Sequence, residues 1–424
     1  MNKNSFPMCV IHELPSGMKI ITEEVSAVRS AAVGIVTATG SGYETPKEAG
    51  ISHFIEHMIF KGTPTRSAFQ IAQEIDSVGG KINAFTSKEY TCYYTVMLDQ
   101  HVDTAVNILS DIFLNSVFDP KEIELEKGVI LEEIKMYEDT PDELIHDFFA
   151  ETIWSGHPMG SPTIGYNSTV KAISQQEIKD YQKRLYTPDN VFIVTSGNVD
   201  HGKIADQFSS AFAKFAGSKN KPELGVPEFT PKSRLKYKKT EQAHICLGTK
   251  GVSHMDPKRY TYAILDNVLG GSMSSRLFQE VREKRGLAYA IYSYNSSLRN
   301  FGAYAVYAGI SRPNLHAVID IILKELGKVK KKGITKDELK RAKEQLKGNL
   351  VLGLETTSSR MNWIAKSQLY YGRVLTVDET IEKIEAVSMD DIISLANEFF
   401  IDKYLNLTVI GDLKEEDIPK TLSC

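Results

Sequence analysis

The sequence predicts an α+β fold built from two similar layered domains, and three observations support this class. The second half of the chain can be laid over the first. Each half begins with alternating apolar stretches typical of strands and continues into long amphipathic helices. A segment rich in Gly, Pro and Lys separates the halves. Strands segregated from helices favour an α+β fold over a doubly wound sheet.

The repeat is clearest in two helices that open on a serine. Ser174 begins "SQQEIKDYQKRLY" and Ser388 begins "SMDDIISLANEFF", an offset of 214 residues. Both serines are typical N-caps that precede acidic first turns. Three further pairs of segments match by eye: 191–200 with 405–414, 118–134 with 334–350, and 52–63 with 261–272. We therefore expect an N-terminal domain over 1–215, a linker over 216–234 and a homologous domain over 235–424.

Strands are expected at the start of the first half, over 18–25, 31–40 and 91–98, where apolar residues alternate. Between the second and third lies "ISHFIEHMIFKGT", Ile51 to Thr63. On a helix, His53 and His57 share one face, and Glu56 lies near it. This H-x-x-E-H pattern suits two zinc ligands and a general base. A packed helix with incidental histidines is the alternative.

A zinc site with catalytic chemistry needs a third protein ligand. The acidic helix predicted from Asp119 and Pro120 offers Glu126 and Glu133, which lie two turns apart on one face. Glu132 points about 100° away from Glu133. Spacing alone does not choose among these three acids, and most acids on such a helix are solvated.

With these residues in place, the chain resembles the M16 (pitrilysin-type, inverzincin) metallopeptidases. "HFIEHMIFKGT" and "EKGVILEEI" are similar to the mitochondrial processing peptidase β subunit and its M16B-like bacterial relatives. "GGKINAFTSKEYTCYY", "WSGHPMGSPTIG" and "LFQEVREKRGLAYAIYS" match further family segments in the same order. The resemblance covers essentially the whole chain and implies a duplicated M16/LuxS-like metallohydrolase fold.

The resemblance also implies roles for the residues of the histidine helix and the acidic helix. His53, His57 and Glu133 would bind one Zn²⁺ per chain. Glu56 would be the general base that activates water. Glu126 would lie beside the site and orient a ligand histidine.

Substrate contacts are implied at four further positions and at two that are shared with catalysis. Asn83, Ala84 and Phe85 would lie on an edge strand that pairs with the substrate backbone. Phe60 would line a side-chain pocket, and a core phenylalanine is the alternative. In the second half, Arg282 and Tyr289 would contact substrate and stabilise the carbonyl oxygen that becomes negative in the transition state; these two residues match the family's substrate-contacting pair.

The duplicate half has lost the metal residues. Tyr262, Leu265 and Asp266 stand over His53, Glu56 and His57, and Asn349 stands over Glu133. Short members of the family work as pairs, so the resemblance implies a homodimer. Each of its composite sites would join the metal half of one chain to the Arg282 half of the other.

The function that the resemblance implies is a zinc endopeptidase acting on extended peptides or unfolded segments in a chamber between domains. Acids such as Glu126, Glu132 and Glu138 favour basic, presequence-like peptides. Two alternatives are a non-catalytic, core-type structural subunit of the same fold and an α-type partner of a separate catalytic chain. The complete histidine and glutamate motif favours the enzyme.

Bulk composition excludes several other classes. The net charge of -4 argues against a nucleic-acid partner. No apolar run is long enough for a membrane span. The four cysteines are far apart, as expected of reduced thiols, and the first residues lack the apolar core of a signal peptide. We therefore expect a bacterial-type cytoplasmic protein.

Overall fold

The structure is a computed structural model that describes residues 9–217 and 223–424. It divides into two compact units. Unit 1 comprises residues up to 134 together with 161–224 and 352–376, and unit 2 comprises 135–160, 225–351 and 377–424. Within the segment expected as a linker, residues 218–222 lie outside the described residues, and β7 begins at Lys232.

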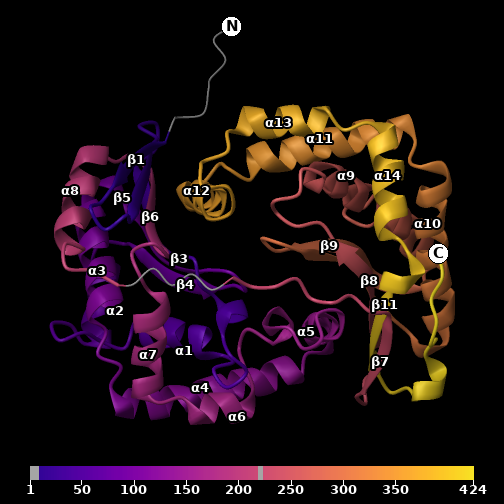
Figure 1. The fold of residues 1–424 in the computed structure, drawn as a ribbon, viewed down its shortest axis with the longest axis horizontal. Coiled ribbons are helices and arrows are strands. Elements are labelled where there is room, and N and C mark those ends of the chain that lie inside the picture. The colour runs from indigo at the N-terminus through magenta and orange to yellow at the C-terminus, as the bar shows by residue number, and fades with distance from the viewer. Residues whose placement is uncertain (1–8, 218–222) are drawn as a thin grey trace, which may run out of the picture. The chain divides into compact units, whose positions relative to one another are not determined.

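Unit 1 is built on a six-stranded mixed sheet in the order β1-β2-β6-β3-β5-β4 (Figure 1). Only the β2–β6 pair is parallel among these neighbours. The strands are β1 Val10–Glu13, β2 Lys19–Glu24, β3 Ser30–Thr37, β4 Lys81–Thr86, β5 Thr91–Leu98 and β6 Val191–Gly197. The helices are α1 Ile51–Met58, α2 Ala68–Ser77, α3 Val102–Asn115, α4 Pro120–Glu138 (whose last residues, from 135, belong to unit 2), α6 Asn167–Ala172, α7 Gln175–Leu185, α8 His201–Ala211 and α12 Thr357–Tyr371.

The two faces of this sheet are covered by different helices. Tyr93 of β5 points to one face, where its ring meets Phe113 of α3 edge-on. Cys92, on the opposite face, packs in a core cluster with Met361 and Ile364 of α12. Figure 1 shows α12 lying against this sheet. β4 forms one edge of the sheet, and within the described residues its only strand partner is β5.

Unit 2 repeats the plan with a five-stranded sheet in the order β7-β11-β8-β10-β9. Here β7 and β11 are parallel, and the other neighbours are antiparallel. The strands are β7 Lys232–Tyr237, β8 Ala243–Gly251, β9 Ala288–Ser297, β10 Gly302–Ile310 and β11 Asn406–Gly411. The helices are α5 Pro141–Ile153, α9 Arg259–Leu269, the π-helix Phe278–Glu283, α10 Leu315–Lys332, α11 Lys336–Leu352, α13 Val377–Glu385 and α14 Met389–Phe399. The predicted fold class, two α/β-layered domains, is confirmed.

Local signals explain the helices that the sequence predicts best. The Ser174 side chain accepts a hydrogen bond from the Glu177 backbone N–H, and the Glu177 carboxylate reaches back to the Ser174 N–H. Ser388 and Asp391 form the same capping box at α14. These reciprocal bonds satisfy backbone donors that a helix start leaves unpaired.

Each unit contains one helix from the other half of the sequence. Segment 135–160, with α5, belongs to unit 2, and segment 352–376, with α12, belongs to unit 1. α5 buries Ile145, Phe148 and Phe149 and packs on β8 and β11. The compact units therefore are not two contiguous halves, because tertiary packing rather than sequence order decides which sheet these helices cover.

Among the helices in the described part of the chain, none combines the length with the apolar composition that a membrane crossing requires.

Candidate metal centre

α1 is a packed helix with one polar face. Ile51, Phe54, Ile55 and Met58 are buried in the unit 1 core. His53, Glu56 and His57 are only half-buried and lie on the remaining face. The sequence left two interpretations of this helix open, a metal-binding helix and a packed helix. They describe two faces of the same element.

The start of α1 is held by a buried carboxylate that the sequence patterns did not reveal. Glu44 Oε2 accepts the Gly50 N–H at 2.7 Å, and Oε1 accepts the Ser52 N–H at 2.8 Å. Burial raises the pKa of Glu44 to about 7, although these hydrogen bonds oppose the rise. A negative charge at this end also suits the helix dipole. Glu44 thus fixes the turn just before His53.

Gly50, the N-cap residue of α1, meets a second constraint. Its φ of 95° lies in the left-handed region, and a Cβ there would come within 2.7 Å of the Ile164 carbonyl oxygen. Glycine permits both the backbone conformation and the close approach.

The structure brings His53, His57 and Glu133 together. Their candidate ligand atoms all lie within 4.8 Å of one another, and no other group of this kind occurs among the described residues. His53 Nε2 is 3.9 Å from Glu133 Oε1, and His57 Nε2 is 3.8 Å from Glu133 Oε2. Tetrahedral zinc with bonds near 2.1 Å spaces its donors roughly 3.4 Å apart. Small side-chain shifts would therefore let all three bind one ion.

The surroundings of His53 suit a metal ligand. Its Nδ1 is buried and has no hydrogen-bond partner in the described part of the protein, and its Nε2 faces Glu133 beyond hydrogen-bond distance. Burial, with His57 beside it, lowers the pKa of His53 to about 4. The ring is therefore neutral near pH 7 and keeps a lone pair for coordination.

Glu126 is hydrogen-bonded to His57. Glu126 Oε1 lies 2.8 Å from His57 Nδ1, and Lys61 Nζ lies 2.5 Å from the other oxygen, Oε2. Burial is the largest single influence on the pKa of His57 and lowers it, but the hydrogen bond to Glu126 and the charges of Glu126, Glu133 and Glu56 together raise it, and the net change is upward. An Nδ1–H that donates to Glu126 leaves Nε2 free toward Glu133. The negative charge of Glu126 is therefore in contact with both His57 and Lys61.

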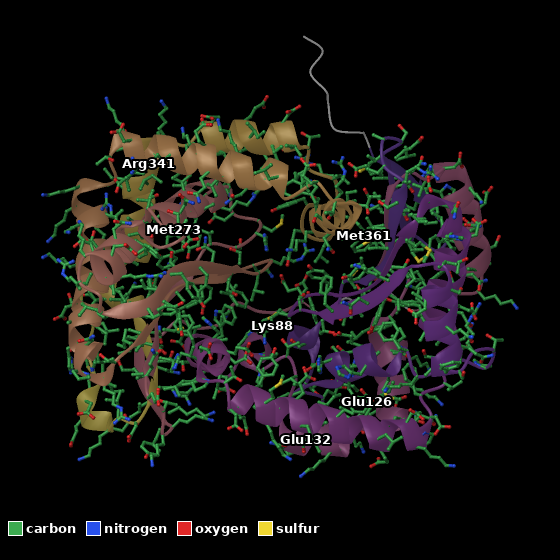
Figure 2. All side chains as sticks on the ribbon, turned by 180° about the vertical axis from the view of Figure 1, so that it is seen from behind. Lys88, Glu126, Glu132, Met273, Arg341 and Met361 are labelled. Atoms are coloured by element: carbon green, nitrogen blue, oxygen red, sulfur yellow. The ribbon has the colours of Figure 1, made fainter. Side chains whose placement is uncertain are left out.

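The three acids that spacing left open are now distinguished. Glu133 faces the histidines, Glu126 is buried against His57, and Glu132 is exposed. Figure 2 labels Glu126 and Glu132 on the same helix, α4, with Glu132 toward its outer side. Geometry supplies the choice that periodicity could not make.

Glu56 lies beside the ligand group without being part of it. Its carboxylate hydrogen-bonds Thr86 at the end of β4. Burial raises the pKa of Glu56, although the Thr86 bonds oppose the shift. A carboxylate with increased proton affinity next to the ligand group suits a general base.

The edge strand β4 has a specific arrangement around Asn83. The Ala84 N–H donates to Asn83 Oδ1 at 2.8 Å, so the Asn83 side chain covers this backbone group. Phe85 packs edge-on against Tyr90 and Tyr94. Phe60, just beyond α1, is partly exposed.

Arg282 and Tyr289 lie in unit 2, where they contact each other. Arg282 belongs to the π-helix Phe278–Glu283 and lies 5.3 Å from the centre of the Tyr289 ring. The Tyr289 side chain is 79% exposed near the start of β9. Arg282 thus lies on a π-helix, a rare element that is frequent at functional sites.

The duplicated helix α9 shows what replaces the metal residues. Tyr262 is buried and packs against the rings of Tyr304 and Phe399. Asp266, at the position of His57, accepts a hydrogen bond from Ser293 Oγ at 2.5 Å. At the positions that correspond to His53 and His57, α9 therefore has a buried, packed tyrosine and a hydrogen-bonded aspartate.

Comparisons with known proteins agree with this geometry. Residues 19–167 match the insulinase family (peptidase family M16), and residues 172–346 match the peptidase M16 inactive domain. The chain is 43% identical over 389 residues to the uncharacterized zinc protease YmxG of Bacillus subtilis, covering 92% of this chain and 95% of that protein. It is 42% identical to the uncharacterized zinc protease SCO5738 of Streptomyces coelicolor, covering 95% and 89%.

Two solved structures share the fold. A protease from Helicobacter pylori superposes with a TM-score of 0.89 at 22% identity, covering 96% of this chain and 100% of that chain. A peptidase M16 inactive domain from Pseudomonas fluorescens gives a TM-score of 0.88 at 17% identity, covering 98% and 100%.

Proposed function

The chain belongs to the M16 family of peptidases, and on this premise we propose that it is a zinc-dependent endopeptidase of extended peptides or unfolded segments. The observation that carries the proposal is the convergence of His53, His57 and Glu133, with Glu56 beside them. Two neutral imidazoles and one carboxylate are a typical donor set for catalytic zinc.

The protein groups divide the work of hydrolysis. Zinc, when bound, lowers the pKa of water and polarises the peptide carbonyl. Glu56 takes the proton from the attacking water on its carboxylate and then delivers it to the departing amine. Glu126 holds the His57 ring in the orientation that presents Nε2.

The free edge of β4 is the proposed docking site for the substrate backbone. An edge strand presents unpaired N–H and C=O groups to which an extended peptide can add. Asn83 Oδ1 already accepts a hydrogen bond from the Ala84 N–H. An incoming strand would displace this side-chain oxygen, and a carbonyl of the substrate would then accept the hydrogen bond from the Ala84 N–H. Pairing through the backbone suits a peptidase that tolerates varied sequences.

We infer that Arg282 and Tyr289 complete the site of a second copy in a homodimer. What supports this is that unit 2 carries the two residues together but no metal-binding group among its described residues. The guanidinium and the phenol would then stabilise negative charge on the carbonyl oxygen during hydrolysis.

A non-catalytic structural subunit is the second candidate. A role in scaffolding alone needs neither the ligand set nor a carboxylate beside it. Here His53, His57, Glu133 and Glu56 are all present and face one small region. This conjunction favours the enzyme.

The proposal predicts that Glu56→Gln keeps zinc but loses activity. We expect about one zinc per chain in both proteins, and kcat/KM for an unstructured peptide lower by about 10² to 10⁴-fold in the variant, because general-base catalysis contributes this much. Metal analysis and mass-spectrometric cleavage assays measure both quantities.

Glu124→Gln is the matched control, because Glu124 is an exposed acid on α4 to which no role in binding or catalysis is assigned. Its zinc content and its activity should equal those of the wild type. Wild-type protein without zinc, or a Glu56→Gln variant that cleaves at the wild-type rate, would refute the proposed function.

A further inference from the structure

A cavity of about 850 Å³ opens in unit 1 beside the first half of β4. Its floor includes Tyr94 and Val96 of β5 and the nearby Val28. One wall is the end of α2, and the other is the start of α12. Its volume lies in the range of ligand-binding pockets, which are mostly apolar with a few polar groups.

The cavity lies along the same strand edge as the candidate metal centre. It borders Lys81, Ile82 and Asn83, whereas Glu56 contacts Thr86 at the other end of β4. Three to five residues of strand separate these positions, or roughly 10–17 Å at 3.3 Å per residue. If the cleaved bond lies opposite Thr86, where Glu56 contacts β4, a peptide paired with β4 would lay residues three to five positions from that bond beside the cavity.

Side chains of an added strand alternate between the two faces of the sheet. The cavity opens on the face of Tyr94 and Val96, which are partly exposed and border the core cluster beneath α12. One side chain of the peptide, at every second position, would point into this space.

The lining selects by apolar contact rather than by charge. The rim carries Asp76 and Glu355, which are negative, and Lys81, which is positive, and all three are exposed. One negative charge is in excess, but all three groups are exposed, so solvent and salt screen the weak preference for a basic side chain that this charge gives. The partly exposed floor of Tyr94, Val96 and Val28 gains most when a large apolar side chain covers it.

The wall made by α12 is held firmly. Arg360 donates from Nε to Glu23 Oε2 at 2.8 Å and from Nη2 to Oε1 at 2.6 Å. Glu23 is 5% exposed, so this bidentate pair is buried. Thr356 caps the helix by accepting the Ser359 N–H. The cavity is thus preformed on rigid elements.

We propose that this cavity is a substrate subsite for a large apolar side chain, aromatic or aliphatic, three to five residues from the scissile bond. The inference rests on the proposed function, since it assumes that the substrate pairs with β4. The subsite would select a substrate side chain, whereas the edge of β4 contacts only the substrate backbone.

The test uses peptides with one cleavable bond in which single positions three to five residues away, on either side, are Ala, Phe, Leu or Arg. We expect Phe or Leu to raise kcat/KM over Ala about ten- to hundredfold at one position, mainly through KM, because burying such a side chain stabilises a complex by this much. The same peptides, fluorescently labelled, are titrated onto Glu56→Gln for affinity without turnover.

Ala72→Trp fills the cavity from α2, and Gln73→Trp places the same ring at the neighbouring exposed position outside it. The Phe-over-Ala preference should fall to near unity in the first variant and stay at the wild-type ratio in the second. No preference at these positions, a preference for Arg, or a preference that survives Ala72→Trp would overturn the subsite. Absence of cleavage of every peptide would instead count against the proposed function, while the titrations still decide the subsite.

Discussion

A histidine binds a metal ion through one of its two ring nitrogens, and the hydrogen bond made by the other nitrogen determines which of the two is available. In His57 this decision falls to Glu126, which lies 2.8 Å from Nδ1. In His53 the Nδ1 atom has no such partner among the described residues. The two proposed ligands are therefore unequal, and His57 is the one whose orientation the protein controls.

Glu126→Gln should weaken zinc binding about 10- to 100-fold, the usual cost of removing a group that orients a ligand. Because Glu126 raises the pKa of His57, the variant should also lower that pKa. Protons compete with zinc for His57, so the pH below which the zinc affinity declines from its high-pH plateau should move downward. Competition with a metal chelator across pH 5–8 measures both effects.

Two changes are expected together in Glu126→Gln. The zinc affinity near pH 8 should fall, and protons should compete with zinc for His57 only at lower pH than in the wild type. Unchanged zinc affinity in Glu126→Gln would show that the contact with His57 does not position a ligand.

Residue-scale predictions from the sequence succeed where the signal is local. The H-x-x-E-H spacing identified a helix face, and the structure places both histidines on it next to Glu133. Glu44 gave no such signal, because it lies in a loop before the helix and acts through backbone N–H groups. The roles proposed for Phe60 and Phe85 remain predictions.

At the scale of elements, α1 depends on the buried carboxylate at its start. Glu44 makes two hydrogen bonds to the first turn, and they hold the backbone that carries His53. Its folded pKa of about 7 lies above the value near 4.3 of an unfolded glutamate. The folded state therefore binds the proton more tightly, and this contribution to stability is lost as pH rises from about 4.3 to about 7.

Glu44→Gln should abolish this part of the pH dependence. Between pH 4.5 and pH 8, the free energy of unfolding of the wild type should fall relative to the variant by about 2–3 kcal/mol. Urea denaturation of the metal-free proteins at several pH values measures the difference.

Glu44→Asp, which keeps a carboxylate, serves as the control and should retain the wild-type slope. A constant stability difference between wild type and Glu44→Gln over this range would show that Glu44 does not titrate there.

Elements were predicted well where caps and alternation are local, as at Ser174 and Ser388. The grouping of α5 with unit 2 and of α12 with unit 1 was not predicted. The apolar face of an amphipathic helix indicates that the helix packs against something, but the sequence does not indicate which sheet it packs against. The cavity beside β4 follows from this grouping, since α12 forms one of its walls.

For the whole molecule, the duplicated fold separates metal binding from the Arg282–Tyr289 pair. Unit 1 holds the only candidate metal-binding group among the described residues, and in α9 of unit 2 the corresponding position is filled by the packed side chain of Tyr262. The proposed homodimer would reunite the two functions in each of two sites. The closed chamber and the preference for basic peptides remain predictions at this scale.

Heterodimers of a Glu56→Gln chain with an Arg282→Ala chain should recover activity. In a composite arrangement, one of the two sites combines an intact metal half with an intact Arg282, so we expect about half of the wild-type rate. Co-expression with two affinity tags isolates the heterodimer for a peptide cleavage assay.

Both homodimers are the controls, and each should be nearly inactive. If the purified heterodimer is as inactive as they are, Arg282 does not act across chains. The same result would leave the metal centre of unit 1 untouched.

The proposed metal site is tested most directly by locating the metal itself. Crystals of the zinc-loaded protein, measured just above and just below the zinc absorption edge, give an anomalous difference map that shows zinc alone. We predict one peak per chain, about 2.0–2.2 Å from His53 Nε2, His57 Nε2 and a Glu133 carboxylate oxygen. No peak there, or a peak on other residues, would contradict the site from which the function is inferred.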